Sequence, residues 1–369
     1  MSLRVIHLLD DGRLEGGGRR ALAALQAVSS LCPELLGVVM APPGAVHEAA
    51  RALGFRSVVL GSRPQMVAAL LRELWRDRHS AVLANGAQHS LWAAALRALL
   101  RGRGAQWHVV QDGSDGPGGL GAARLLARLG LRFVAPSTFV RRRLEAQGVP
   151  WERVEVIADF LPAAPVAERE LFTGAGLRRV VMLTALEHAD RVDLLLDALE
   201  RQGALRGLRF DIYGEGAEAA ALRERAQRHP NVNFHGARGD AAQALAQADL
   251  LLHTGPRDGA GRRVLQAFAA GVPVLVPNSG AAGDMVVPGR NGWHFTANDA
   301  TALSLRLQQL MGATAGELNA MAEGGRRTLR RELNAQRQGA RWAALLGARP
   351  KATQPAPLLA AASDTGAAG

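Results

Sequence analysis

The amino-acid sequence predicts an α/β protein with two Rossmann-like domains, each a parallel sheet covered by helices, on either side of a cleft. Apolar segments of strand length alternate with longer segments of helical period along most of the 369 residues. This alternation is typical of parallel sheets with helical crossovers. It stops and restarts once near the middle of the chain, so two domains are expected. Open α/β sheets bind ligands at the carboxyl ends of their strands, which places the site in the cleft.

The first half is predicted to contain a run of strands with amphipathic helices between them. The helices carry arginines on one side and Leu, Ala or Trp on the other, the pattern of a helix that covers a sheet. The last of these helices stops at Gly148, before Pro150, which is a normal helix ending. The predicted strands are Arg4–Leu9, Leu36–Met40, Ser57–Leu60, Ala81–Ala84, Trp107–Gln111, Arg132–Ala135 and Arg153–Ile157, and the predicted helices include Met66–Arg78, Leu91–Leu100 and Thr138–Gln147.

A linker and a second domain follow. Residues 159–176 contain prolines and glycines without periodicity, which marks a linker. We therefore expect an N-terminal domain over residues 1–160, a linker over 161–176 and a C-terminal domain over 177–348. Residues 349–369, rich in Ala and Pro, are predicted to be a disordered tail. The predicted strands of the second half are Arg179–Leu183, Leu208–Tyr213, Val232–His235, Leu250–His253 and Val272–Val276.

The composition favours a small anionic ligand over a nucleic acid. The net charge is +11, and Lys351 is the only lysine among the basic residues; a positive balance favours phosphates, nucleotides or acidic lipids. Aromatic residues make up only 4% of the chain and no nucleic-acid-binding motif is visible, which argues against DNA or RNA. No apolar stretch is long enough to span a bilayer. The single cysteine, Cys32, excludes an internal disulfide or a cysteine metal cluster and fits a reducing cytoplasm.

Two glycine-rich loops follow predicted strands. After the first strand the chain reads Gly16-Gly17-Gly18 before a helix, and such glycines let the amides of a helix N-terminus approach an anion. In the second half, Gly214-Glu215-Gly216 ends a strand and opens another helix. Either loop would also serve as a plain turn, and the first does not have the spacing of the dinucleotide fingerprint.

The segment between residues 248 and 276 carries the most informative motif. A buried strand runs into a glycine-rich loop with Asp258, Gly259 and Gly261, and the next helix carries Gln266. Asp258 and Gln266 are eight residues apart, about two helical turns, so both could address one bound molecule from nearly one face.

These motifs resemble the retaining GT-B glycosyltransferases of the family-4 type over nearly the whole chain. The family's Glu-(seven residues)-Glu motif falls on Asp258 and Gln266, in a degenerate form. Its Gly-Gly-x-Pro-Glu loop falls on Gly280 to Asp284, and its N-terminal Gly-Gly loop falls on Gly16 and Gly17. The resemblance implies the GT-B fold, in which two Rossmann-like domains with parallel sheets face a central cleft.

The resemblance also implies roles for these positions. The family's first motif acid contacts the donor sugar, which implies that role for Asp258. The second contacts the nucleotide ribose, which implies that role for Gln266, while glycine-loop amides meet the diphosphate. The donor-binding residues expected here are Gly16, Gly17, Gly18, Arg191, Gly214, Glu215, Arg257, Gly259, Gly261, Gln266 and Asp284.

The sequence departs from the family at the cations that neutralise the leaving diphosphate. Those positions are occupied by Thr184-Ala185 and Asp190-Arg191. Stabilising the charge that develops on the diphosphate is the main catalytic task of such an enzyme. We therefore hypothesise that another arginine supplies the charge from a shifted position. The candidates are Arg191, Arg257, Arg262 and Arg263.

A second departure lies in the first domain, where Gln111 takes the place of a histidine near the reaction centre. His108 precedes it by three residues on the opposite face of the strand, so we expect His108 to pack in the core. Asp112 and Asp115, on the following loop, could face the acceptor or could simply be solvated. The candidate catalytic residues are Asp258, Gln111 and Asp112.

Two classes of function remain open. The first is a retaining, hexosyltransferase-like glycosyltransferase that moves a sugar from a nucleotide-sugar donor to a glycan or lipid-linked acceptor, in cell-surface polysaccharide or lipopolysaccharide synthesis. The second is a catalytically degenerate homologue that binds a glycan or a partner protein. A nucleotide-sugar epimerase is disfavoured, because no acid or histidine pair is positioned for proton abstraction. No metal or other cofactor is expected, since no acid or histidine cluster has ligand spacing.

Basic helices in the first half suggest contact with a membrane. Arg97, Arg101, Arg103 and Arg141–Arg143 could bind anionic headgroups, at ~1 kcal/mol for each cation. A solvated helix face is the alternative. Together with the resemblance to enzymes that act on lipid-linked acceptors, these arginines predict a cytoplasmic protein with peripheral contact at the inner face of the cytoplasmic membrane.

Overall fold

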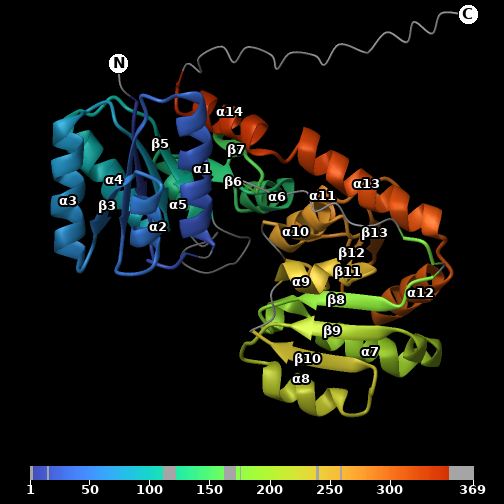
Figure 1. The fold of residues 1–369 in the computed structure, drawn as a ribbon. Helices are drawn as coiled ribbons and strands as arrows, with labels where there is room; N and C mark the ends of the chain where they lie inside the picture. The colour runs from blue at the N-terminus through green and yellow to red at the C-terminus, as the bar shows by residue number, and fades with distance from the viewer. Residues whose placement is uncertain are drawn as a thin grey trace, which may run out of the picture.

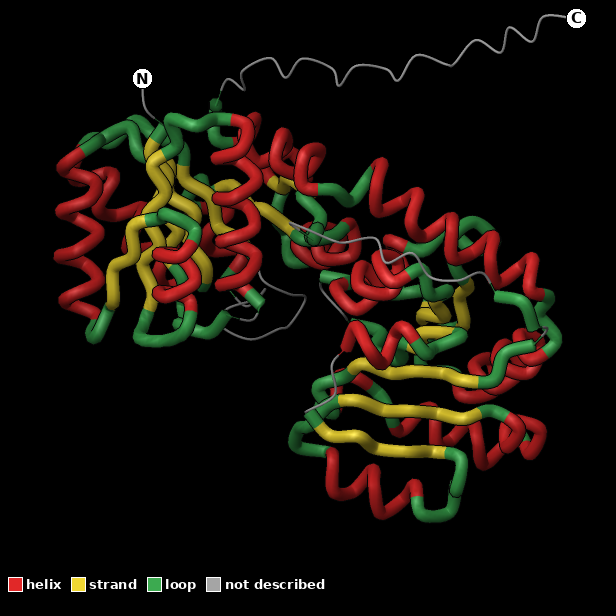
Figure 2. The backbone as a smooth tube through the Cα atoms, in the orientation of Figure 1, coloured by secondary structure: helices red, strands yellow, loops and turns green. Residues whose placement is uncertain are grey.

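The structure, a computed structural model, describes residues 3–14, 16–110, 122–161, 172–174, 176–237, 241–257 and 260–348. Two sheets, each with helices on both faces, form two domains (Figures 1 and 2). Every strand pair within either sheet is parallel. The predicted α/β class with two Rossmann-like domains is therefore confirmed.

The first sheet has the strand order β3-β2-β1-β4-β5-β6-β7. Its central strands are mostly apolar, and their successive side chains point to opposite faces, so both faces of β1 and β4 are buried. Val5 packs with α1 and α2, whereas Ile6 packs with α3 and α4 on the other side. The elements are β1 (Arg4–Leu8), α1 (Gly17–Leu31), β2 (Leu36–Ala41), α2 (Val46–Ala52), β3 (Arg56–Val59), α3 (Arg63–Arg76), β4 (Ala81–Asn85), α4 (Ala87–Leu100), β5 (Gln106–Val109), α5 (Ala123–Arg128), β6 (Arg132–Ala135), α6 (Thr138–Ala146) and β7 (Val154–Val156), with a 3-10 turn at Trp151–Arg153.

The second sheet has the order β10-β9-β8-β11-β12-β13. Val180 packs with α7, α8 and α12 on one face, and Val181 packs with α9 and α10 on the other. The elements are β8 (Arg179–Leu183), α7 (Asp193–Arg201), β9 (Arg209–Tyr213), α8 (Ala219–Ala226), β10 (Val232–Gly236), α9 (Ala241–Ala246), β11 (Leu250–Leu252), α10 (Arg262–Ala270), β12 (Val274–Pro277), α11 (Gly280–Met285), β13 (Trp293–Phe295), α12 (Ala300–Met311), α13 (Ala315–Arg331) and α14 (Ala335–Leu345), with 3-10 turns at His188–Asp190 and Gly203–Gly207.

The predicted strands are all present, with ends that move by no more than two residues. Strand β13 was not predicted. It has only three residues, Trp293–Phe295, and follows the turn Arg290-Asn291-Gly292 directly. Such a short segment shows no alternation that sequence reasoning can detect.

The last helix of the range predicted for the second domain, residues 177–348, contacts the first domain. Helix α14 packs against α1 of the first domain, as Figure 1 shows, while α13 lies along the second domain. Trp342 is 1% exposed and belongs to the same core cluster as α1. A Cβ on Gly339 would lie 2.8 Å from the Cβ of Ala27, so the two helices approach closely. The apolar face of α14 decides its place, and sequence order does not.

The strand order locates the ligand site in each domain. The order reverses between β1 and β4 in the first sheet and between β8 and β11 in the second. At such a switch point the two following loops run to opposite faces of the sheet and leave a crevice at the carboxyl ends of the strands. A ligand is therefore expected at the loops after β1, β8 and β11.

Candidate active site

The loop after β1 contains three glycines with different physical roles. Gly16 has φ +51°, a conformation that favours glycine, and a Cβ there would meet nothing within 4 Å. A Cβ on Gly18 would lie 2.2 Å from the carbonyl oxygen of Arg13, so glycine is required there by the backbone itself. Gly17 is buried in the first turn of α1. Of the three, Gly16 has open space around it, which leaves room for a ligand at the start of α1.

Arg20, in the next turn, anchors α1 to the carboxyl end of the first sheet. Its guanidinium donates to the carbonyl of Val110 at 3.1 Å and to that of Ile157 at 2.8 Å, and forms an ion pair with Asp159 at 3.1 Å. The side chain is 8% exposed and lies 6.0 Å from the ring centroid of Trp342. Sequence reasoning missed Arg20, although its position directly after the glycine run was a usable signal.

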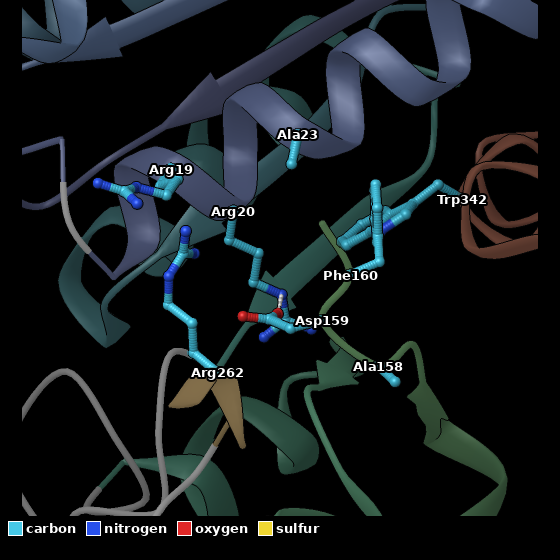
Figure 3. Close-up of a pocket in the computed structure, with 8 residues that line it drawn as sticks. All are labelled: Arg19, Arg20, Ala23, Ala158, Asp159, Phe160, Arg262 and Trp342. Carbon is cyan, nitrogen blue, oxygen red and sulfur yellow. Dashed lines mark ion pairs between the residues drawn. The ribbon is translucent and has the colours of Figure 1, made fainter. Parts of the chain in front are cut away.

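The starts of α1 and α10 meet between the domains. Arg19 and Arg20 line one small pocket with Arg262, the first residue of α10 (Figure 3). The pocket has a volume of about 10 Å³, room for no more than one water. Gly261, which precedes α10, has φ +64°. The structure therefore brings the predicted Gly16–Gly18 loop and the predicted Gly261 loop to the same cleft.

Glycines of the loop after β9 are required by packing against the loop after β8. A Cβ on Gly214 would lie 1.7 Å from the carbonyl oxygen of Thr184, and one on Gly216 would lie 1.9 Å from that of Ala185. Glu215, between them, accepts a hydrogen bond from Arg223 at 2.5 Å. These glycines hold the two loops in backbone contact, and their presence by itself does not require a ligand.

Asp190 ties the loops at the switch point of the second sheet together. Its carboxylate accepts from the backbone N–H of Ala185 at 3.0 Å and from Arg263 at 2.8 Å. Burial alone would raise the pKa of Asp190, but Arg263 and the hydrogen bonds hold that pKa below its usual value. Its backbone carbonyl accepts from the hydroxyl of Thr254, after β11, at 2.7 Å. The acid that replaces a family cation is thus paired with a cation from α10.

The four candidate arginines occupy two kinds of environment. Arg263 is paired with Asp190, and Arg191 forms an ion pair with Asp193 at 3.0 Å. Arg191 also donates to the side-chain oxygen of Asn298 at 2.6 Å. Arg257 and Arg262 instead line cavities between the domains. Arg257 and Arg262 are therefore the two candidates placed beside a space between the domains.

A cavity of about 270 Å³ opens at the carboxyl ends of β11, β12 and β13. Arg257 lines it from the second domain, and Arg143 lines it from α6 of the first. No acid is found among the described lining residues. The hydroxyl of Ser279 donates to the carbonyl of Pro256 at 2.9 Å and holds the two loops at its edge together. The two cations and the absence of a described acid favour an anion here.

Asp284, predicted to bind the donor, contacts the first domain. Its carboxylate accepts from the backbone N–H of Phe139, in the first turn of α6, at 2.5 Å. Burial raises the pKa of Asp284, against the opposing effect of that hydrogen bond. A carboxylate at a helix N-terminus is stabilised by the helix dipole, so this contact helps hold the domains together.

Of the remaining predicted site residues, the structure describes Gln266. Gln266 is half-buried on α10, one turn after Arg262. Asp258, Gly259, Gln111, Asp112 and Asp115 lie outside the described residues.

His108 is confirmed as a core residue. It is fully buried, its Nδ1 lies 2.8 Å from the hydroxyl of Ser90, and its ring meets Phe133 edge-on at 5.5 Å. Burial lowers the pKa of His108 to about 4, so its imidazole is neutral near pH 7. The core interpretation made from strand alternation is correct.

The prediction that Arg97 binds the membrane is wrong. Arg97 is 6% exposed, and its guanidinium donates to backbone carbonyls, including that of Ser80 at 2.8 Å and that of Ala105 at 3.3 Å. The helix face that carries Arg97 packs toward β4 and β5, so this cation cannot reach a headgroup. Arg101 is exposed.

The described residues provide neither a metal site nor a membrane-spanning helix. No group of three or more His, Cys, Asp or Glu side chains in this part of the chain is arranged to hold a metal ion. None of its helices combines the length and apolar character needed to cross a membrane.

Part of the second domain is similar to known proteins in sequence. Residues 178–313 match a family model described as Glycosyl transferases group 1. A GDP-mannose-dependent alpha-mannosyltransferase of Mycobacterium tuberculosis (strain CDC 1551 / Oshkosh) is 33% identical over 176 residues, which cover 46% of this chain and 45% of the mannosyltransferase. The chain thus matches about half the length of its curated relatives.

Solved structures match over almost the full length. HepE of Anabaena, solved in complex with UDP, superposes with a TM-score of 0.76 at 18% identity, covering 94% of this chain and 100% of HepE. The lipopolysaccharide outer core galactosyltransferase WaaB, in its apo form, gives a TM-score of 0.74 at 14% identity and covers 94% of this chain and 99% of WaaB. The chain therefore has the GT-B fold. Its second domain contains the segment that matches the Glycosyl transferases group 1 model.

Proposed function

We propose that this protein is a glycosyltransferase that moves a sugar from a nucleotide-sugar donor to a hydroxyl of a glycan or lipid-linked acceptor. The observation that carries the proposal is the set of arginines at the switch points of two facing sheets. Arg19, Arg257 and Arg262 line cavities where the carboxyl ends of both sheets meet. A donor diphosphate is the anion that such a site in a GT-B fold would hold.

The diphosphate would lie near the start of α10, between Arg257 and Arg262. The first amides of a helix point at an anion, and the helix dipole adds positive potential. The two guanidiniums would neutralise the charge that grows on the leaving diphosphate. Asp190 would hold Arg263 beside them through the 2.8 Å ion pair. This arrangement replaces the cationic pair that the loop after β8 lacks.

The sugar and ribose would be held by the degenerate motif. Asp258 would accept hydrogen bonds from sugar hydroxyls, and Gln266 would use its amide to contact the ribose. Gln266 lies one turn after Arg262 on α10, as a ribose ligand next to the diphosphate would require. The names of the similar proteins, a GDP-mannose-dependent mannosyltransferase and a UDP complex, make GDP-mannose and UDP-glucose the first donors to test.

Donor binding is the experiment that tests the proposal. The purified full chain is titrated by calorimetry with GDP-mannose, UDP-glucose, GDP and UDP, and thermal shift is recorded in parallel. A donor at a hundred times its Kd stabilises the folded state by ~2.7 kcal/mol. We expect one nucleotide to give such a shift in the wild type, with loss of binding in Arg257→Gln and Arg262→Gln. The Asp258→Ala variant should weaken the sugar nucleotide more than the free nucleotide.

Arg201→Gln is the matched control, because Arg201 is exposed at the end of α7 and the change removes the same charge. Its donor affinity should equal that of the wild type. If no nucleotide binds the wild type, the transferase proposal fails and the catalytically degenerate binding module takes its place. Equal loss in the control and the site variants would instead show that only net charge matters.

We also propose that the first domain contacts the inner face of the cytoplasmic membrane. Apolar side chains are exposed on helices that neighbour each other over one face of the first sheet: Trp75 on α3 is 70% exposed and Leu99 on α4 is 74% exposed. Arginines such as Arg101 and Arg103 flank the end of α4. Apolar groups with a cationic rim suit an anionic lipid surface.

Vesicle sedimentation tests this contact. Leu99→Ser should reduce binding to anionic vesicles, whereas Leu305→Ser, at a 50% exposed position on α12 of the second domain, should not. If both variants bind as the wild type does, the first-domain surface is not the membrane contact.

A further inference from the structure

A second cavity, which we call the hinge cavity, lies between the domains and is lined by neither Gly16–Gly18 nor Gly261. Its volume is about 260 Å³, the volume of roughly nine waters. It lies between the domains, where the N-terminal end of α6 and the end of β7 meet α11 and the junction of α13 with α14. Figure 1 shows α13 and α14 following one another across the two domains at this place. The cavity is large enough for a small organic anion.

Cations dominate the lining of this hinge cavity. Arg290, Arg337 and Arg341 line it, and Asp284 and Glu332 are its only acids among the described residues. Asp284 is engaged with the backbone N–H of Phe139. Glu332 lies 3.3 Å from Arg290 and offsets part of its charge. The balance of the lining is therefore positive.

Arg337 and Arg341 are one turn apart on α14 and carry like charges. Two cations at this spacing on a helix repel each other. The guanidinium of Arg337 donates to the backbone carbonyl of Arg331 at 3.3 Å, a neutral partner that leaves its charge uncompensated. Both residues lie on the helix that begins at Ala335, so the first turn of α14 and its dipole add further positive potential.

The three arginines come from both domains. Arg290 lies between α11 and β13 of the second domain, whereas Arg337 and Arg341 are on α14, which packs against α1 of the first. An anion held by all three would bridge the two units at the hinge. Phosphate suits guanidinium groups because its oxygens can accept several charge-assisted hydrogen bonds at once.

We propose that the hinge cavity binds a small phosphate monoester, held by Arg290 from one domain and by Arg337 and Arg341 from the other. The site is separate from the donor cleft, and its occupancy stabilises the relative position of the two domains. The proposal does not rest on the transferase activity, since it concerns neither Asp258 nor the loops around α10. Asp284, the one expected donor residue in the lining, is engaged by the N–H of Phe139.

The test compares two double variants of the full chain. Arg337→Gln/Arg341→Gln removes two cavity cations. Arg327→Gln/Arg331→Gln removes two exposed cations from α13 that do not line the cavity, and so makes the same change in net charge. Glycerol 3-phosphate is titrated by calorimetry, with potassium chloride at equal ionic strength as the reference. We expect the cavity variant to bind at least about tenfold more weakly than the wild type, a change of ~1.4 kcal/mol, and the α13 variant to bind normally.

Vesicles with phosphatidic acid, compared with phosphatidylcholine alone, separate the two sources of a phosphate monoester. Binding of glycerol 3-phosphate that depends on Arg337 and Arg341 assigns the site to a soluble metabolite, and vesicle binding with the same dependence assigns it to a lipid headgroup. Equal weakening in both double variants, or no effect beyond that of chloride, overturns the proposal. A phosphate that binds in the donor cleft would be insensitive to these changes. If the double variant does not fold, Arg341→Gln alone repeats the test at an exposed position.

Discussion

Acidification should destabilise the first domain through His7, a buried histidine on β1. His7 is 2% exposed, and neither of its ring nitrogens has a hydrogen-bond partner. Burial, and to a smaller extent the charge of Arg20, lowers the pKa of His7 to about 3, from its usual 6.5. The folded protein therefore keeps this imidazole neutral at a pH where the unfolded chain protonates it.

The sign and the size of the effect follow from that difference in pKa. The lowered pKa of the folded state means that the stability is fully present above pH 6.5 and is lost as the pH falls from 6.5 toward 3. At pH 5 the unfolded histidine is 1.5 units below its pKa, which corresponds to ~2 kcal/mol in favour of unfolding. His108, whose pKa is lowered to about 4, should add a similar ~2 kcal/mol.

Urea denaturation at pH 8 and at pH 5 measures the effect. In His7→Leu the loss of unfolding free energy between the two pH values should be smaller than in the wild type by ~2 kcal/mol. His79→Asn, at a position 61% exposed, serves as the control and should keep the loss seen in the wild type. An unchanged loss in His7→Leu would refute the reasoning, because it would mean that His7 already binds its proton in the folded state.

Three further predictions concern backbone packing and buried guanidiniums. Gly214→Ala should cost several kcal/mol of unfolding free energy, because the new Cβ would lie 1.7 Å from a carbonyl of the neighbouring loop. Gly289→Ala is the control, because this position has open space at φ +75°, and it should cost only ~1–2 kcal/mol. Chemical denaturation measures both. Arg97→Gln should lower the melting temperature, with a loss of ~2–4 kcal/mol from unpaired carbonyls, and should leave vesicle binding intact, while Arg101→Gln should do the reverse. Arg20→Lys should lose at least ~1.5 kcal/mol by urea denaturation, since one ammonium cannot replace the guanidinium contacts to two strand ends; a stability equal to that of the wild type would contradict this anchoring role.

The fold was predictable because alternation and length are local properties of a sequence. The runs Arg4–Leu8 and Arg179–Leu183 are mostly apolar and almost wholly buried, which is typical of strands buried on both faces. Strand β13 was not predicted, because a strand of three residues is too short to show the two-residue alternation of apolar and polar side chains. The place of α14 was not predicted, because its apolar face is visible in the sequence but its partner α1, more than 300 residues earlier, is not.

The candidate site was predictable in location and less so in the role of each residue. Glycine runs marked the loops correctly, yet a sequence does not distinguish Gly214, which is required by backbone contact, from Gly16, which has open space. The ion pair between Arg263 and Asp190 could not be predicted from the sequence either, because the two residues are 73 positions apart. The contact of Asp284 with α6 joins positions 145 residues apart and depends on how the domains meet.

The position of α14 has a consequence for how the chain acquires its structure during synthesis. The first domain needs Trp342 to cover α1, so its outer face stays open to water until residue 342 has left the ribosome. The second domain can close its own sheet earlier, since that sheet is complete at Phe295. The second domain would then fold before the first, the opposite of their order in the chain. A chain that ends before α14 should contain a folded second domain and an incompletely folded first domain.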